Sequence, residues 1–460
     1  MSTHPSSSDE LSTRDVFGAT SIRYGNKYDH NTPLIEIWQK DRDYLLFAAN
    51  LTSKKNNARP IGSPQADLIR VAAELTFGDK AEAAKLYSQY SSWYRHAHLG
   101  EGLDELPRPT AKDCRRIFAE TTILAGHFDL DGLYSVASTI ALGGALGGPS
   151  GGDPARQGAI FSRLRLLRYG ANQLQEFSQM LGARAGEVVV IIDFAAHPQA
   201  ALTLDHHATC LKFWELGTDL PCGIYDIGMP SCPRLLATHC GLQIPEPILS
   251  GCDMVDGAQY VNVEQTIDLS NPFVAFELAL QVDVSEPIAK KAVITLAEND
   301  LDPLSVLREP IWQARLQLLS LELEEQKRFW SKPRHIDAKN DYVAIADARL
   351  APYPGARFRY LPFANDQVRE RPYLITIRSS GIGRTNLGLG RNPFYRDPSF
   401  FEYHPLNLGA LAAELGKGGG RMEASSVTVE SGELDRTITQ VIAQIERSVL
   451  NTAPEPDAEA

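Results

Sequence analysis

Short apolar runs that end in polar residues recur through the middle of the chain. The segments Thr121–Gly126, Val188–Asp193 and Ala201–Asp205 are runs of this kind, each of strand length. Apolar stretches at Leu133–Leu146 and Leu164–Leu181 have the length and spacing of buried helices. Strands that alternate with helices predict an α/β fold with a parallel sheet and helices on both of its faces.

The pattern changes in the last third of the chain. Residues Pro310 to Trp330 predict a long amphipathic helix, with Leu319 and Leu323 on its apolar side and Glu322 on its wet side. The elements predicted beyond it are strands at 342–347, 373–378 and 426–429 and helices at 406–415 and 434–450. We therefore predict a second, smaller α/β domain that follows a helical linker.

These patterns give the expected domain organisation. It consists of a Ser-rich disordered segment at 1–15, a mostly helical N-terminal extension at 16–115, a parallel-sheet catalytic domain at 116–305, a linker helix at 306–333, a substrate-binding α/β domain at 334–450 and a disordered tail at 451–460.

Composition excludes some classes of function. The formal net charge is -12, and a protein that clamps long duplex DNA usually carries a basic surface. Six cysteines in 460 residues do not indicate a disulfide framework. The N-terminus lacks the basic start and apolar run of a secretory signal, and no apolar stretch has the length of a membrane span. We therefore expect a cytoplasmic protein that does not associate with a membrane.

Acidic residues and histidines gather where the predicted strands end. They are His127, Asp129 and Asp131 in HFDLDG, Asp193 after the next strand, Asp205, His206 and His207 in DHH, and the later Asp253 and Asp256. The carboxyl ends of parallel strands share one sheet edge, so these groups should converge. Buried acids are costly unless cations accompany them, and mixed imidazole and carboxylate ligands suit Mn, Fe or Zn, with Mg at oxygen-rich positions.

In this order and spacing the motifs resemble those of the DHH phosphoesterase superfamily, over about residues 120 to 430. The superfamily includes RecJ-type exonucleases, nanoRNases, cyclic-dinucleotide phosphodiesterases, exopolyphosphatases and family II pyrophosphatases. The resemblance implies that one metal is held by His127 and Asp129, that the other is held by Asp131, His206 and Asp253, and that Asp193 bridges the two. It also implies that Asp205 orients the neighbouring imidazoles and that His207 contacts the scissile phosphate, and it leaves Asp256 as an outer carboxylate or a helix residue.

The second domain has an unusual local charge. Between residues 351 and 400 there are eight arginines, no lysine and three acids, a local charge of +5. Arginine forks suit phosphate, and glycine-rich backbone can approach an anion closely. The segment resembles the DHH-associated domain, although Arg421 and Ser426 stand where His and Gly are usual. The residues expected to bind substrate are Arg391, Asn392, Gly418, Gly419, Gly420 and Arg421.

The leading functional hypothesis is hydrolysis of phosphodiester bonds in short nucleotide substrates, with two divalent ions as cofactors. Mn²⁺ is the expected ion, with Mg²⁺ or Co²⁺ as alternatives. The expected partner is a small phosphate-bearing substrate, a nucleotide or short single-stranded oligonucleotide, and a homodimer is compatible with the sequence. One alternative is an exopolyphosphatase, a pyrophosphatase or a nucleotide phosphomonoesterase. Another is a nucleotide-sensing protein without turnover.

Overall fold

The computed structural model describes residues 102–451, apart from short gaps at 169–173, 208–209, 215–218, 283, 333–334, 353–357, 382, 398, 416–417 and 421–423. The segment expected to be disordered at 1–15, most of the extension expected at 16–115 and nearly all of the tail expected at 451–460 lie outside the described residues. Residues Leu103–Lys212 and Pro221–Ala460 form one compact unit. Within the described part of the chain, every helix is too short or too polar to span a lipid bilayer.

The first sheet has five strands, all parallel, as the alternating pattern predicted. In the order β2-β1-β3-β4-β5 its strands are β2 Leu164–Leu167, β1 Ile123–His127, β3 Val189–Ile192, β4 Ala200–Asp205 and β5 Gly223–Tyr225. The chain leaves β1 towards β2 on one side and then returns to place β3 on the other. The carboxyl ends of β1 and β3 therefore form a topological switch point, where open α/β sheets bind their ligands.

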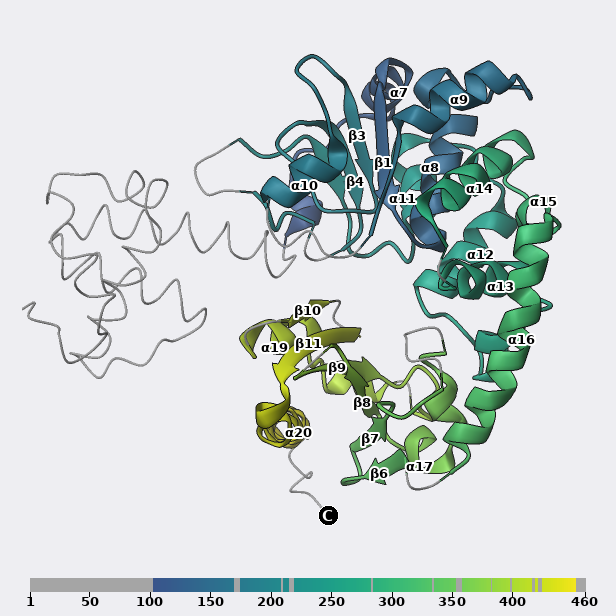
Figure 1. Cartoon of the computed structure of the whole chain (residues 1–460). Coiled ribbons are helices and arrows are strands. Elements are labelled where there is room, and N and C mark those ends of the chain that lie inside the picture. Colours follow the sequence, from purple (N-terminus) through teal and green to yellow (C-terminus); the bar gives the residue numbers. More distant parts are fainter. Residues whose placement is uncertain are drawn as a thin grey trace, which may run out of the picture. The chain divides into compact units, whose positions relative to one another are not determined.

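Helices flank this sheet (Figure 1). The helices of this part of the chain are α7 Ala111–Glu120, α8 Leu130–Ala141, α9 Pro154–Arg163, α10 Leu174–Leu181, α11 Cys232–Cys240, α12 Glu246–Asp256, α13 Pro272–Leu280, α14 Glu286–Glu298 and α15 Pro303–Leu307, with short 3-10 turns at Leu103–Glu105, Ala145–Gly147 and Glu264–Ile267; of these, α12, α13 and α15 pack mainly on other helices. Helix α8 packs against β1, α11 and α14, and its residues from Leu130 to Ile140 are all buried. The element that carries the second half of HFDLDG is thus fixed on several sides.

The helix predicted over Leu164–Leu181 is wrong in its first part. Residues Leu164–Leu167 form β2, and only Leu174–Leu181 form a helix, α10. Leucine suits either element, and a short apolar run lacks the period that would separate them. Pairing with β1 decides the outcome, because Leu164, Leu166 and Leu167 are buried along that edge of the sheet.

The predicted linker helix is α16, Pro310–Trp330. Leu319 and Leu323 are buried as expected, but Glu322, which the pattern placed on the wet side, is only 3% exposed. The helix buries more than one stripe because both Trp312 and Trp330 also pack into the core.

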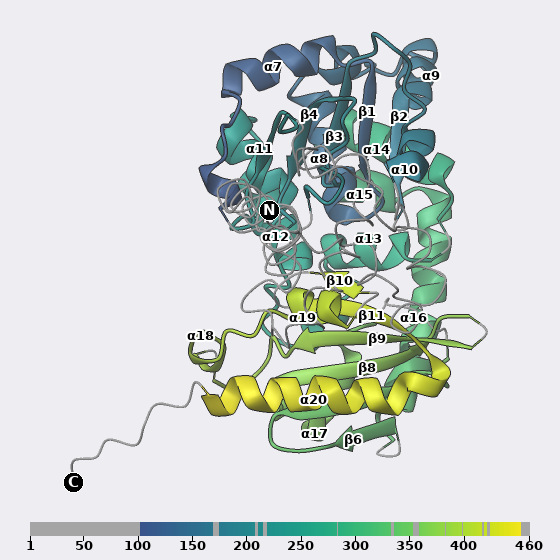
Figure 2. The same cartoon turned by 90° about the vertical axis from the view of Figure 1, so that its left-hand side faces the viewer.

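The second sheet has six strands and is mixed. In the order β10-β11-β9-β8-β7-β6 the strands are β10 Gly418–Gly420, β11 Ala424–Glu430, β9 Arg384–Arg391, β8 Tyr373–Ser379, β7 Val343–Asp347 and β6 Ile336–Ala338. Only β7 and β8 pair in parallel. The remaining elements are η6 Leu361–Ala364, α17 Asp366–Arg369, α18 Phe400–Tyr403, α19 Leu408–Glu414, η7 Ser431–Glu433 and α20 Leu434–Asn451, and α20 lies across one face of this sheet (Figure 2).

Strand β9 falls in the stretch that the sequence offered as a glycine-rich anion loop. Leu387 and Leu389 point into the core of the second domain, while Gly388 and Gly390 alternate with them. In β9 leucine alternates with glycine, and the β-branched residues that usually mark strands are scarce. The sequence therefore did not predict a strand here.

Candidate metal centre

The first part of the centre lies between the end of β1 and the start of α8. His127 ends β1 and is 2% exposed. Asp129 caps α8 through a hydrogen bond that its Oδ1 accepts from the Gly132 amide at 2.9 Å. Its Oδ2 lies 2.6 Å from His127 Nδ1. A Cβ at Gly132 would stand 2.3 Å from the His127 carbonyl oxygen, so the turn requires glycine here.

Asp131 continues this group from the first turn of α8, where it is 1% exposed. Its carboxylate accepts hydrogen bonds at 2.9 and 3.1 Å from the amide of Cys232, the first residue of α11. Its Oδ2 also lies 3.3 Å from His206 Nε2. Two helix N-termini therefore support this carboxylate, and both place partial positive charge near it.

Asp193 follows β3 and has an unusual backbone. Its φ of 57° lies in the left-handed region, which residues other than glycine rarely adopt. Its side chain is 1% exposed, and neither carboxylate oxygen accepts a hydrogen bond from a described residue. Oδ2 lies 3.6 Å from His127 Nδ1, and Oδ1 lies 3.5 Å from His206 Nε2. Its two oxygens thus belong to two different groups of side chains.

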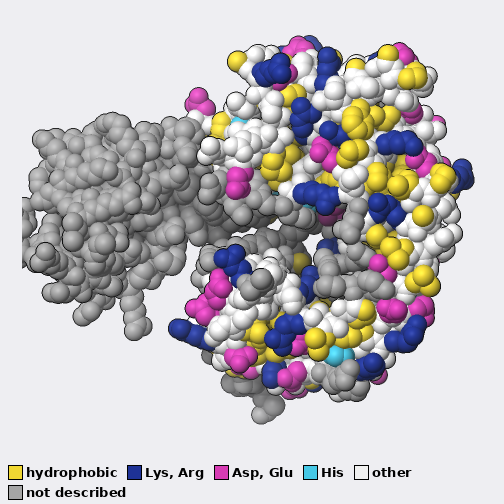
Figure 3. Space-filling view, viewed as in Figure 1, with side chains coloured by type: hydrophobic (Ala, Val, Ile, Leu, Met, Phe, Trp, Pro, Cys, Tyr) yellow, Lys and Arg dark blue, Asp and Glu magenta, His cyan; other side chains and the backbone are white. Residues whose placement is uncertain are grey.

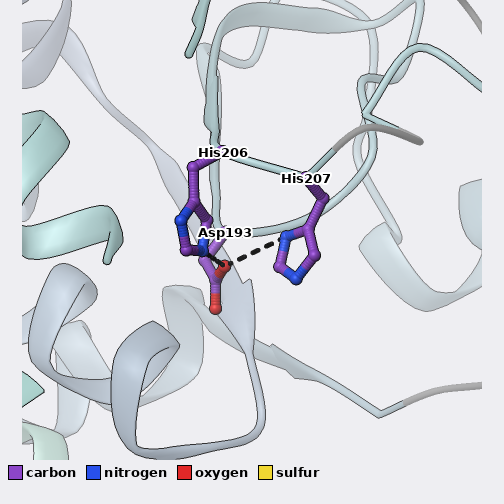
Figure 4. A group of neighbouring side chains, drawn as sticks. All are labelled: Asp193, His206 and His207. Atoms are coloured by element: carbon purple, nitrogen blue, oxygen red, sulfur yellow. Dashed lines mark ion pairs between the residues drawn. The ribbon is translucent and has the colours of Figure 1, made fainter. Parts of the chain in front are cut away.

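The residues after β4 complete the arrangement around Asp193 (Figure 4). The Nδ1 of His206 lies 2.9 Å from the Met229 carbonyl oxygen, which can only accept, so Nδ1 carries the hydrogen and Nε2 faces the acids. The Nδ1 of His207 lies 2.8 Å from Oδ1 of Asp205, a carboxylate that is 1% exposed. The Asp205 side chain therefore orients His207, whose own side chain is 26% exposed.

The structure assigns different positions to the two later aspartates. Asp253, the predicted ligand, accepts a hydrogen bond from Ser231 Oγ at 2.6 Å and two from Arg234 at 2.6 and 2.9 Å. Asp256, one helical turn further along α12, places its Oδ2 3.3 Å from His206 Nε2. Of the two carboxylates, Asp256 is thus the one that lies beside His206 in this structure. Asp253 is instead held by Arg234 and Ser231, a pairing that the sequence alone did not reveal.

Several carboxylates lie close together in the cluster, and their mutual influence shifts the pKa values of the groups around them. Burial, followed by the charges of Asp193 and Asp256, raises the pKa of Asp131 well above its ordinary value. Burial lowers the pKa of His206, but its contacts with Asp131, Asp193 and Asp256 outweigh this and hold the pKa well above its usual range. Burial likewise lowers the pKa of His127, but the charges and hydrogen bonds of Asp129 and Asp193 together raise it well above its ordinary value. Without a cation, protons must balance these carboxylates.

The donor set fits divalent cations. Among the described residues, ligand atoms gather within 4.8 Å of one another in three overlapping groups: His127, Asp129 and Asp193; Asp131, His206 and Asp256; and Asp193, His206 and His207. Imidazole nitrogen and carboxylate oxygen are together typical of Mn, Fe and Zn sites. Buried carboxylate oxygens without hydrogen bonds, such as those of Asp193, are what a cation would satisfy.

Two further residues near the centre were not singled out from the sequence. Arg168 follows β2, and its guanidinium carbon lies 4.2 Å from the ring centroid of Phe128, the residue between His127 and Asp129. Glu277 in α13 accepts a hydrogen bond from the Leu130 amide at 3.1 Å. Burial, followed by the charge of Asp129, raises its pKa. Neither belongs to a motif, and only the fold brings them to this edge.

The second domain uses several predicted substrate contacts for its own structure. Asn392 is 1% exposed, and its side chain bonds the backbone of Arg369, Arg371 and Phe394. Arg391 donates to the Leu406 carbonyl oxygen at 2.9 Å. Residues Gly418–Gly420 form β10 and pair with β11, and Arg421 lies outside the described residues. Asn392 is therefore a turn residue rather than one poised for substrate.

The aromatic residues of the same stretch pack mainly against one another. Tyr395 lies against Phe400 with ring centroids 5.4 Å apart, and Phe401 lies 5.7 Å from Tyr373. Basic and acidic side chains are interspersed on the face seen in Figure 3.

Comparisons with known proteins bear on the fold. No protein-family model and no curated protein sequence matches the chain. In structure it is similar to a pGpG-specific phosphodiesterase, PggH from Vibrio cholerae, with a TM-score of 0.50 and 16% identity over 71% of this chain and 100% of that one.

Lower TM-scores relate the chain to two other structures. They are the DHH domain of a protein described as a member of a ribosomal-protein family (0.46, 12% identity, 80% of this chain and 99% of that one) and RecJ from Thermus thermophilus in complex with Mn²⁺ (0.41, 14% identity, 80% and 59%). The likeness to the phosphodiesterase shows that the chain shares the fold of that protein.

Proposed function

We propose that this chain is a metal-dependent phosphoesterase that hydrolyses phosphodiester bonds in short nucleotide substrates. The observation that carries the proposal is the geometry of Asp193. A buried carboxylate on a left-handed backbone directs one oxygen towards His127 and the other towards His206, without accepting a hydrogen bond from any described residue. A carboxylate shared between two cations needs this disposition.

The ligand set follows from the groups around that carboxylate. His127 and Asp129 would hold one cation, and Asp131, His206 and Asp256 the other, with Asp193 shared between them. We expect Mn²⁺ as the cation, with Mg²⁺ or Co²⁺ as alternatives, because the donors are mixed nitrogen and oxygen. When bound, two such cations polarise the phosphoryl group and stabilise the attacking and leaving oxygens of an in-line displacement.

His207 is the residue best suited to act on the substrate itself. Its Nδ1 donates to the buried Asp205, which fixes the ring and leaves Nε2 as the atom for a substrate oxygen. The backbone amide of His207 also donates to Asp205 at 3.1 Å, so the carboxylate holds both the ring and its main chain. We propose that His207 binds the scissile phosphate and supplies a proton to the leaving oxygen.

The choice of nucleotides over inorganic anhydrides rests on the planar groups beside the ligands. The Arg168 guanidinium is exposed and stacks on Phe128 at the sheet edge that carries His127. Such planes bind nucleobases by stacking, a contact that an inorganic phosphate chain cannot make. A protein of the same fold, PggH, is named for its action on the linear dinucleotide pGpG. This makes dinucleotides the first substrates to test.

The decisive experiment is a substrate screen with Mn²⁺. Purified protein is incubated with dinucleotides, oligonucleotides of two to five residues, cyclic dinucleotides, polyphosphate, pyrophosphate and a 3′-phosphorylated adenosine nucleotide. The proposal predicts that mononucleotides are released from the short diesters. Release of phosphate from the anhydrides or the monoester alone would replace it with the corresponding alternative. No turnover of any substrate would favour a nucleotide-sensing protein.

Two variants secure the assignment. Asp193→Ala removes the shared carboxylate and should abolish turnover and Mn²⁺ binding together. Asp337→Ala is the matched control, because Asp337 is an exposed aspartate on β6 whose ion pair among the described residues is with Lys339. Retained turnover in the Asp193 variant would contradict a shared ligand at this position.

A further inference from the structure

The connection between β5 and α11, residues 226–231, contacts the DHH motif at both ends of a turn. The Asp226 amide donates to the Asp205 carbonyl oxygen at 3.2 Å, directly after the last residue pair of β4 and β5. The Met229 amide closes the turn by donating to the Asp226 carbonyl oxygen at 3.1 Å. The Met229 carbonyl oxygen in turn accepts from Nδ1 of His206 at 2.9 Å. The conformation of this turn therefore sets the direction of the His206 imidazole.

The side chain of Asp226 holds the turn in shape. Its Oδ1 accepts from the Gly228 amide at 3.1 Å, and its Oδ2 lies 2.8 Å from Nε2 of His239, in the last turn of α11. An ionised carboxylate only accepts, so Nε2 carries the hydrogen. Nη1 of Arg108 lies 3.4 Å from the same Oδ2 and within 3.5 Å of both ring nitrogens of His239. The side chains of Asp226, His239 and Arg108 are 14%, 20% and 25% exposed, so water screens these contacts only in part.

The rest of the connection borders the other proposed ligands of the cation that His206 would hold. The amide of Cys232, the residue that follows it, donates to the Asp131 carboxylate at 2.9 and 3.1 Å. Pro230 packs against the end of α12, because a Cβ at Gly257 would stand 3.2 Å from the Cβ of Pro230, and Gly257 directly follows Asp256. A shift of the turn would therefore reach the surroundings of all three residues of this ligand group.

A metal-binding imidazole depends on the partner of its second nitrogen, which fixes both the tautomer and the plane of the ring. Side chains or carbonyl groups commonly serve as this partner, and losing one typically lowers metal affinity by ~10- to 100-fold. For His206 the partner is the main-chain carbonyl of Met229, which no side-chain substitution removes. Its position depends on the turn, and the side-chain contacts of Asp226 are the means by which the fold fixes that turn.

We propose that Asp226, fastened by His239 and Arg108, is a positioning residue of the metal centre. It acts on His206 through the Met229 carbonyl and so keeps Nε2 of that imidazole directed at the cation. This inference rests on the proposed phosphoesterase function and deepens it, because it adds side chains from outside the motifs to the support of one cation. If the cluster served only to attach α11 to the sheet, its loss would lower stability and leave cation binding unchanged.

The test measures cation binding by the full chain and its variants. Mn²⁺ is titrated by calorimetry into metal-free protein, and the visible absorption spectrum of the Co²⁺ form reports the geometry of the ligands. Asp226→Ala should weaken Mn²⁺ binding at one of the two sites by about 10- to 100-fold and change the Co²⁺ spectrum. His239→Ala, which removes one contact of Asp226, should weaken it by about tenfold. His239→Gln, whose amide can place an N–H near the position of Nε2, should restore most of the affinity.

Thr238→Ala is the matched control, because Thr238 is exposed in the same turn of α11 and should bind Mn²⁺ as wild type does. Thermal unfolding in EDTA follows the stability of each variant, and the two His239 variants decide the question if Asp226→Ala does not fold. A lower melting temperature together with the Mn²⁺ affinity and Co²⁺ spectrum of wild type would overturn the proposal. Equal Mn²⁺ affinities of His239→Gln and His239→Ala would overturn it as well.

Hydrolysis of short diesters, measured separately at saturating Mn²⁺, distinguishes failure of this inference from failure of the proposed function. His239→Ala should lower kcat more than it raises KM. If wild type binds Mn²⁺ but hydrolyses no diester, the proposed function fails, and the binding data still decide the role of Asp226. If wild type hydrolyses diesters and His239→Ala matches it in affinity, spectrum and kcat, the function stands and the positioning role falls. Wild-type protein that binds no cation would overturn both.

Discussion

Asp253 and Asp256 have different contacts in the structure. This gives a prediction that distinguishes the ligand suggested by the geometry, Asp256, from the ligand implied by the motif, Asp253. Asp253→Ala removes three hydrogen bonds, one from Ser231 and two from Arg234. Charged hydrogen bonds contribute about 1.5–3 kcal/mol each when buried. The Arg234 side chain is 27% exposed and keeps its contact with Glu246, so we expect a total loss of about 2–3 kcal/mol. At about 2–4 °C per kcal/mol for a domain of 150–250 residues, the melting temperature of the catalytic domain should fall by roughly 4–12 °C.

Asp256→Ala should impair metal binding more than stability. The change removes one of the like charges that raise the pKa of Asp131, and it takes away a carboxylate 3.3 Å from His206. The melting temperature of metal-free protein should therefore fall less than in Asp253→Ala. Loss of a residue that only supports a metal ligand typically lowers affinity or activity by ~10- to 100-fold. Loss of a ligand itself should lower Mn²⁺ affinity and turnover by at least as much.

The assay is thermal unfolding of both variants in EDTA and with saturating Mn²⁺, together with a Mn²⁺ titration by calorimetry. Metal that binds only the folded state raises the melting temperature, so the gain on adding Mn²⁺ reports the integrity of the site. The reasoning fails if Asp253→Ala is folded but gains nothing from Mn²⁺ while Asp256→Ala gains as much as wild type.

Three further outcomes follow from the same geometry. Gly132→Ala should cost about 1–3 kcal/mol of unfolding free energy, seen in thermal melts, because its Cβ would meet the His127 carbonyl oxygen at 2.3 Å; an unchanged melt would contradict the close approach. Mn²⁺ binding should release protons, and Mn²⁺ affinity should rise with pH, because the raised pKa values of His127 and His206 favour their protonated forms in the absence of metal. Calorimetry in buffers of different ionisation enthalpy measures the protons exchanged on binding, and proton uptake would contradict this prediction. Arg168→Ala should raise KM for nucleotides by a factor that corresponds to about 1–3 kcal/mol, the contribution of base stacking, and should leave turnover of anhydrides unchanged. Equal effects on nucleotide and anhydride substrates would exclude base stacking.

The sequence predicted those parts of the fold where one signal dominates. The runs before His127, Asp193 and Asp205 are almost entirely apolar and end in a charged or polar residue, as fully buried parallel strands do. Helix α16 also begins and ends where its pattern does. Strands β2 and β9 were missed because leucine and glycine carry no strand preference, and pairing with neighbouring strands decided their structure.

The candidate site was harder to predict where two equivalent residues compete. Asp253 and Asp256 lie three positions apart on one helix, so both can approach the same sheet edge. What separates them is Arg234, a residue of α11 whose contact with α12 depends on the tertiary packing of the two helices. The same holds for Arg168 and Glu277, since each reaches the centre from an element without a motif.

Asp193 concentrates most of the unfavourable energy of the site. A left-handed backbone at a residue other than glycine costs on the order of 1 kcal/mol or more, and a buried carboxylate without hydrogen bonds adds to this. The imidazoles of His127 and His206 offset only part of the cost of the buried carboxylate, since their nitrogens lie 3.6 and 3.5 Å from its oxygens. Strain of this kind persists only where the surrounding structure enforces it, and here the hydrogen bond from the Asp193 amide to Leu204 at 2.7 Å keeps the backbone in register with β4. The fold therefore holds the carboxylate in place in advance, and binding of cations is the event that would recover the energy.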